Sequence, residues 1–181
     1  MHIILGLLGS IVTILILLNR LAEAGIDLGG LNPFLWHRRR QWRKQYDGDP
    51  IYKISNPMDL TALLMVAVAK SDGDMSTEEK KKILELFQSE FHLSKRNASE
   101  LMIASVYLLK DGSELRSNLK KVLQPSLDRF SQEQAQSALS LVNRVAAMEH
   151  ESNAIKQELV GNITASLAPA MQDKHKWQTA P

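Results

Sequence analysis

The chain has 181 residues, of which 44% are hydrophobic and 23% charged, a balance typical of a globular domain with an additional segment. It contains no cysteine, which excludes disulfides, thiolate zinc sites and a cysteine nucleophile. The net charge is +2, yet residues 1–46 hold six of the 22 Lys and Arg and two of the 20 Asp and Glu. Because the basic excess is local, we do not expect a nucleic-acid surface spread over the chain.

The first predicted element is an uncharged apolar stretch from Ile3 to Leu18. As a helix it covers about 24 Å, and the residues up to 24 can lengthen it towards the roughly 30 Å of a bilayer core. We therefore predict a single transmembrane anchor over residues 1–24. A cleaved signal peptide, which Ala22-x-Ala24 would suit, and a buried helix are the alternatives.

Residues 25–56 are predicted to form a basic-aromatic juxtamembrane segment and, from residue 47, a turn-rich linker. Aromatic rings suit the bilayer interface, and basic side chains suit anionic headgroups. The positive-inside rule then places all that follows in the cytoplasm. Nucleic-acid binding by this stretch is the alternative, but the adjoining apolar segment already explains the cluster. The expected membrane-interface residues are Trp36, Arg38, Arg39, Arg40, Trp42, Arg43 and Lys44.

Residues 57–169 carry apolar side chains at helical spacing, which predicts an all-α bundle of about six or seven helices. The first two helices, within 60–91, should pack against each other as an antiparallel pair. The expected buried face of the first is Leu60, Leu63, Leu64, Ala67 and Val68, and that of the last is Ile155, Leu159, Ile163 and Leu167.

Local signals mark several helix ends. Ser76 with Glu79, and Ser131 with Gln134, match the capping box that opens a helix. Pro125 is expected to end a short helix that runs through 115–123, and Pro169 to end the last one, because proline cannot donate a backbone hydrogen bond. Residues 170–181 are expected to be a polar tail.

The acidic turn Asp72-Gly73-Asp74 joins the first two helices, and a weaker counterpart recurs at residues 149–151. Carboxylate oxygens at such a turn suit a divalent cation such as calcium or magnesium. The spacing is not that of an EF-hand, because Thr77 and Ile83 stand where that motif needs Gly and Glu. The alternative is that these carboxylates shape the turn and cap a helix. The candidate metal ligands are Asp72, Asp74, Glu79, Glu149 and Glu151.

An apolar helix ending in Ala-x-x-Asp-Gly, followed by a Ser-x-x-Glu helix start, resembles the tellurite-resistance TerB-like family. The residues that carry the resemblance are Ala69, Asp72, Gly73, Ser76 and Glu79, and it extends over about 59–167. It implies an all-helical bundle, often tied to membranes or stress responses, and no agreed catalytic activity. The layout is also similar to that of membrane-anchored DjlA-type co-chaperones, although this chain has no His-Pro-Asp tripeptide of a J-domain.

The expected function is that of a membrane-anchored, non-enzymatic interaction or scaffold module in a stress or envelope response at a bacterial inner membrane. No Gly-x-Ser-x-Gly, Gly-rich phosphate loop or His-Glu-x-x-His motif indicates an enzyme. The expected partners are membrane lipids and another protein, a homo-oligomer is left open, and no nucleic acid is expected. The alternative is a domain that binds or senses a divalent cation, its cofactor, through the acidic turn.

Overall fold

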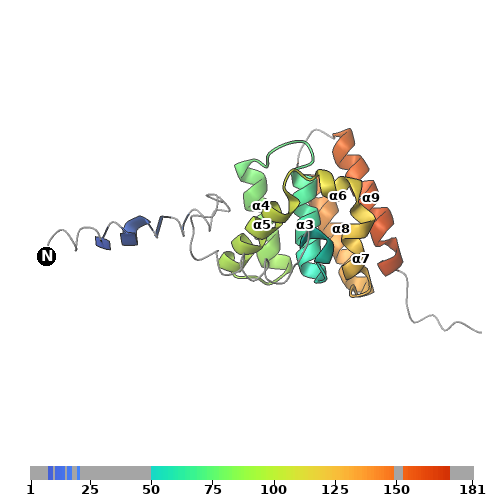
Figure 1. Cartoon of the computed structure of the whole chain (residues 1–181), viewed down its shortest axis with the longest axis horizontal. Helices are drawn as coiled ribbons and strands as arrows, with labels where there is room; N and C mark the ends of the chain where they lie inside the picture. Colours follow the sequence, from blue (N-terminus) through green and yellow to red (C-terminus); the bar gives the residue numbers. More distant parts are fainter. Residues whose placement is uncertain are drawn as a thin grey trace, which may run out of the picture.

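Helices make up all the regular structure of the described chain, in a computed structural model that describes residues 8–9, 11–14, 16–17, 20, 50–148 and 153–171. The predicted all-α class is confirmed within these ranges (Figure 1). The elements are η1 (Pro50–Lys53), α3 (Pro57–Ala69), α4 (Thr77–Glu90), α5 (Lys95–Leu109), α6 (Ser113–Ser117), α7 (Leu119–Leu127), α8 (Gln132–Ala146) and α9 (Ala154–Met171).

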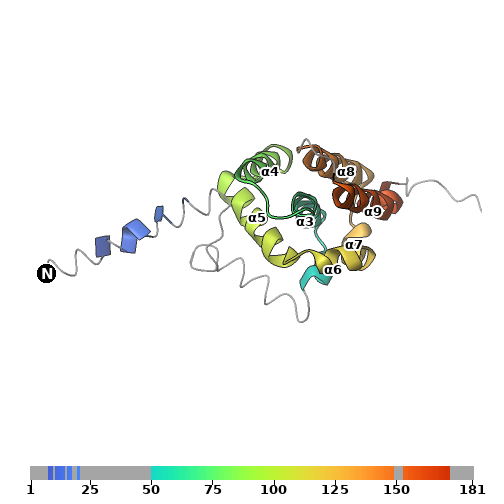
Figure 2. The ribbon, with the colours of Figure 1, turned by 90° about the horizontal axis from the view of Figure 1, so that it is seen from above.

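The central element is α3, which the other helices surround (Figure 2). Residues 60–69 are buried without interruption, none more than 4% exposed. The sequence pattern predicted one buried face, whereas the structure buries the whole circumference. The reason is that α5 and α8 both pack extensively against α3, while α4, α7 and α9 also contact it. A helix that is apolar all round needs this enclosure to be stable in water.

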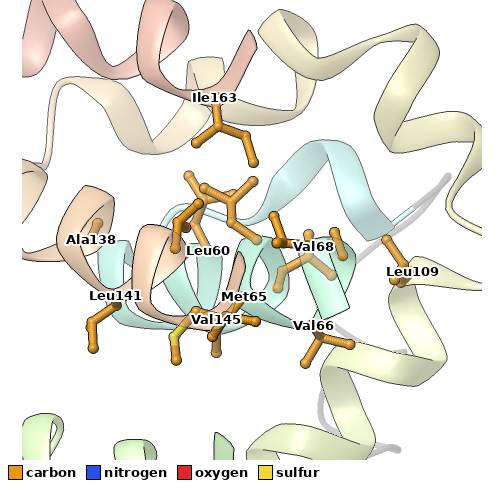
Figure 3. Packing of buried hydrophobic residues seen from close by; sticks show 14 of the residues in the cluster. Leu60, Met65, Val66, Val68, Leu109, Ala138, Leu141, Val145 and Ile163 are labelled. Atoms are coloured by element: carbon orange, nitrogen blue, oxygen red, sulfur yellow. The ribbon is translucent and has the colours of Figure 1, made fainter. Parts of the chain in front are cut away.

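The surrounding helices are amphipathic and turn their apolar faces towards α3. On α4, Ile83 and Phe87 are fully buried, and the Phe87 ring stacks on Phe91 with 5.4 Å between centroids. Figure 3 shows that side chains from α3, α5, α8 and α9 meet in one core. The residues labelled there are Leu60, Met65, Val66, Val68, Leu109, Ala138, Leu141, Val145 and Ile163.

Both predicted capping boxes are confirmed. The Ser76 hydroxyl accepts a hydrogen bond from the Glu79 N–H at 3.1 Å, and the Glu79 carboxylate accepts one from the Ser76 N–H at 2.8 Å. Ser131 and Gln134 exchange the same two bonds, each of 3.1 Å. Asn56, which the sequence analysis did not single out, caps α3. These bonds satisfy N–H groups that a helix start otherwise leaves without intrahelical partners.

Two prolines lie inside helices that they were predicted to end. Helices α7 and α9 each continue for two residues beyond Pro125 and Pro169. Late in a helix a proline removes one backbone hydrogen bond, and burial in the last turn can offset that loss. Ser126 is fully buried in the last turn of α7, and Ala170 is 3% exposed in that of α9. The short helix predicted around 115–123 is instead divided at Asn118 into α6 and α7.

The short helix η1 lies within the expected linker, yet it contributes to the core. Ile51 and Ile54 are 1% and 2% exposed. The Ser126 hydroxyl donates to the Ile54 carbonyl at 2.6 Å, and the Lys121 ammonium lies 4.5 Å from the centroid of the Tyr52 ring. These contacts fix the beginning of the bundle against α7.

The described residues of the predicted anchor, from Leu8 to Arg20, are helical. Within the described ranges no helix has both the length and the apolar character needed to cross a membrane. The predicted span of Ile3 to Leu18 falls only partly in these ranges, and the basic-aromatic segment 36–44 lies outside them. Six large apolar side chains of this N-terminal helix are 48–62% exposed, namely Leu8, Ile11, Val12, Ile14, Ile16 and Leu17.

Candidate functional site at the acidic turn

The acidic turn connects the end of α3 to the start of α4. The chain leaves α3 through Ser71, whose hydroxyl donates to the Val68 carbonyl at 2.8 Å. Gly73 follows with a φ of 150°, which a glycine adopts most readily. Met75 is 6% exposed, so its side chain anchors the turn in the core before Ser76 caps α4. The backbone of the turn is therefore held at both ends.

Asp72 forms an ion pair with a buried lysine on the last helix. One carboxylate oxygen of Asp72 lies 3.0 Å from the ammonium nitrogen of Lys156. The Lys156 side chain is 4% exposed and that of Asp72 22%. At this separation and burial the two charges interact strongly, because little water screens them. The pair ties the turn between α3 and α4 to the first turn of α9, about 84 residues further along the chain.

The other two predicted ligands of the turn have different neighbours. Asp74, whose side chain is 98% exposed, lies 3.7 Å from the ammonium of Lys70. Glu79 is buried and accepts the hydrogen bond from the Ser76 N–H that completes the capping box. Each carboxylate is thus engaged by a cation or an N–H group of the chain itself.

The predicted metal ligands are only partly placed. Glu149 and Glu151 lie outside the described residues. Within the ranges 50–148 and 153–171, no three histidine or acidic side chains come close enough together to hold a metal ion. The divalent-cation hypothesis therefore stays a prediction, and what the structure shows at Asp72 is an ammonium group of the protein.

Lys156 is the site residue that sequence reasoning missed. The buried stripe of α9 is Lys156, Leu159, Ile163, Leu167 and Ala170, at spacings of three and four residues. Ile155, expected on that stripe, is 49% exposed, so this part of the expectation was wrong. The spacing alone could have identified Lys156, because this residue lies three positions before Leu159 and so falls on the same face of the helix. A lysine at such a position calls for an acidic partner from another element.

A cleft of about 450 Å³ opens between α8 and α9 beside this ion pair. Its lining mixes amide groups with small apolar side chains. Within it, Asn143 donates its amide to the Leu139 carbonyl and Asn153 accepts from the Ile155 N–H, so both are held by their own helices. The lining residues are Asn143, Ala146, Ala147, Asn153, Lys156, Gln157, Val160 and Gly161.

Gly161 provides a test of how open this cleft is. A Cβ added there meets no atom within 4 Å, and the residue lies inside α9. Gly161→Ala is therefore expected to stabilise the protein by about 0.5–1 kcal/mol, because alanine loses less conformational entropy in a helix. Chemical denaturation measures the change. Gly112→Ala is the matched control and should destabilise, because Gly112 has a φ of 75°. A loss of stability in Gly161→Ala would mean that another group of the protein occupies the space beside Gly161.

A comparison with known protein families identifies the family to which the helical bundle belongs. The family model described as tellurite resistance protein TerB matches residues 58–168, from α3 to near the end of α9. No significant match was found among curated proteins or among solved structures. The matched region covers more than half of the chain and agrees with the stretch that carries the sequence resemblance. The chain therefore belongs to the TerB family of tellurite-resistance proteins.

Proposed function

We propose that this TerB-family chain is a non-enzymatic interaction module that its N-terminal helix holds at the cytoplasmic face of an inner membrane. The TerB domain makes it a helical module related to tellurite resistance, and we assign it to a stress or envelope response. The observation that carries the proposal is the set of six exposed apolar side chains on the N-terminal helix. Exposed apolar side chains gathered on one helix are unfavourable in water and favourable in lipid.

The sequence that follows the helix supports this orientation. Residues 36–44 combine aromatic rings with five basic side chains, a composition suited to the cytoplasmic headgroup layer. The mechanism would be one of placement, in which the anchor concentrates the bundle near the membrane and the bundle binds another protein. An N-terminal anchor followed by a TerB domain would be similar in layout to DjlA-type membrane proteins.

The cleft between α8 and α9 is the surface that we assign to the protein partner. It presents polar side chains beside small apolar ones, to which an extended or helical segment of a partner could bind. Lys156 is one of its lining residues, and the ammonium of this lysine is paired with Asp72. A partner segment bound here would contact both α8 and α9.

Membrane anchoring is tested by placing charges on the N-terminal helix. In full-length protein, the double variant Ile11→Lys/Ile14→Lys is expected to move from the membrane fraction to the supernatant after a carbonate wash. Each charge within a bilayer core costs about 2.5–3.5 kcal/mol on insertion scales. Both side chains are about half exposed in the structure, so the bundle itself should stay folded.

Ile155→Lys is the matched control for this experiment. It introduces one lysine, against two in the double variant, at an apolar side chain of similar exposure, but on α9. This variant should remain in the membrane fraction. A wild-type chain that leaves the membrane with the carbonate wash would contradict the anchor. A reporter fused to the C-terminus and active only in the periplasm would contradict the cytoplasmic orientation.

A further inference from the structure

A small basic surface lies where the chain enters the bundle. It consists of Lys53 on η1 and of Lys120 and Lys121 on α7, all exposed, and we call it the η1–α7 basic surface. Neither helix contains an acidic residue. The nearest acidic residue that follows α7 in the chain is Asp128, just beyond its end.

This surface is held in place by the packing of η1 on α7. The Lys121 ammonium lies over the Tyr52 ring at 4.5 Å, and the Ser126 hydroxyl donates to the Ile54 carbonyl at 2.6 Å. On α7 the buried residues fall on one side of the helix. Lys120, Lys121 and Gln124 lie on the exposed side. The two lysines of α7 therefore share one outward direction, and η1, which carries Lys53, packs directly against this helix.

The length of chain between this surface and the basic-aromatic segment limits how far apart they can be. Lys44 precedes Pro50 by six residues, which span at most about 22 Å when fully extended. The proposed function places Lys44 among lipid headgroups. The η1 end of the bundle must then lie within a few tens of ångströms of the membrane, while α4 lies on the far side of the bundle from α7 (Figures 1 and 2).

We propose that the η1–α7 basic surface rests on anionic lipid headgroups and sets the orientation of the bundle on the membrane. This inference depends on the proposed membrane anchor and adds to it the face that meets the lipid. Charge complementarity and the short connection from Lys44 favour a lipid surface as the occupant. Each lysine near an anionic surface changes the ratio of docked to undocked bundle roughly fivefold. The docked bundle would turn α4 away from the lipid.

The chain contains no cysteine, so one introduced thiol can report the orientation. The full-length protein carrying Gln124→Cys, on the exposed side of α7, is labelled with an environment-sensitive fluorophore and reconstituted into vesicles. The vesicles contain phosphatidylcholine alone or phosphatidylcholine with phosphatidylglycerol, together with a lipid whose headgroup carries a nitroxide quencher. Ser89→Cys, at an exposed position of α4, gives the matched label on the far side.

We expect strong quenching at position 124 in vesicles that contain phosphatidylglycerol, weak quenching without it, and weak quenching at position 89 in both. Adding Lys120→Gln/Lys121→Gln should lower the docked-to-undocked ratio roughly 25-fold. Lys81→Gln/Lys82→Gln on α4, which removes the same charge, should leave it unchanged. Circular dichroism checks that both variants are folded.

Equal quenching at the two positions, or quenching at position 124 that ignores the anionic lipid, would overturn the basic surface as the docking face. Flotation of the same vesicles after a carbonate wash separates this failure from failure of the anchor. A chain that floats but shows no preference for position 124 overturns this inference alone. A chain that does not float overturns the anchor and this inference together.

Discussion

Asp72→Ala is expected to destabilise the bundle by about 3 kcal/mol, because it removes one partner of a buried ion pair and leaves the other charge buried. The charge left behind is the ammonium of Lys156, whose side chain is 4% exposed. Its neighbours on the buried stripe of α9 are apolar and cannot replace the carboxylate. Denaturant unfolding followed by circular dichroism measures the loss of free energy of unfolding.

The reverse substitution should cost less. In Lys156→Met the apolar stem of the side chain is kept, and the Asp72 carboxylate, which is 22% exposed, can be hydrated. The double variant Asp72→Ala/Lys156→Met should be more stable than Asp72→Ala alone, since a well-packed apolar residue can replace a buried ion. This rescue is the result that a general disturbance of the turn would not produce.

Asp74→Ala is the matched control on the same turn. Its carboxylate is almost fully exposed and lies 3.7 Å from the ammonium of Lys70, so its removal should cause no measurable change. If Asp72→Ala and Asp74→Ala behaved alike, or if Lys156→Met added to the loss caused by Asp72→Ala, the ion pair would not be what holds the turn to α9.

The same proteins also test the divalent-cation alternative. Because the chain already places cations or N–H groups on Asp72, Asp74 and Glu79, we expect calcium and magnesium to leave the unfolding temperature of the wild type unchanged. A cation that binds the native state would raise it. A rise that disappears in Asp72→Asn/Asp74→Asn would support the metal site, and calorimetric titration with calcium, magnesium and zinc would then give its affinity.

Leu64→Ala is expected to cause a loss of about 2–5 kcal/mol, because it leaves a cavity in a helix that is packed on all sides. Leu64 is fully buried at the middle of α3. A loss of this size is a large fraction of the stability of a small domain and should lower the unfolding temperature by many degrees. Thermal unfolding followed by circular dichroism measures it.

Ile155→Ala removes an aliphatic side chain of the same size from a position that is 49% exposed, and it should change the stability by at most about 0.5 kcal/mol. The contrast between the two substitutions tests the enclosure of α3 directly. Similar small losses at both positions would show that α3 is less tightly surrounded than the structure indicates.

Local signals were enough to predict much of this fold. The capping boxes at Ser76 and Ser131 depend on residues three apart, and the structure shows both of their hydrogen bonds. The burial of α3 was predicted on one face only. How many helices surround it depends on contacts between distant segments, which the period of a single helix does not report. The packed helix η1 was missed for a related reason, because four residues are too few to show a periodic pattern.

The candidate site was predicted in part. The acidic turn was located correctly from Asp72, Gly73 and Asp74, since a glycine between two short acidic residues is a strong turn signal. Its neighbour Lys156 lies far away in sequence and belongs to a residue type that is normally exposed. The buried stripe of α9 begins at that lysine, whereas the sequence pattern predicted that it begins one residue earlier, at the exposed Ile155.

Because α3 is enclosed, its residues serve the stability of the fold, whereas binding is left to the helices around it. From residue 60 to residue 69 the helix offers no side chain to the outside, so a ligand, lipid or partner can meet only the helices around it. A saturation mutagenesis screen can score the abundance of the protein and its recruitment of a partner separately. Substitutions in α3 should lower the abundance. They should have no further effect on recruitment once the change in abundance is taken into account. Selection for a new partner would have to change the helices that surround α3 and leave α3 itself unchanged.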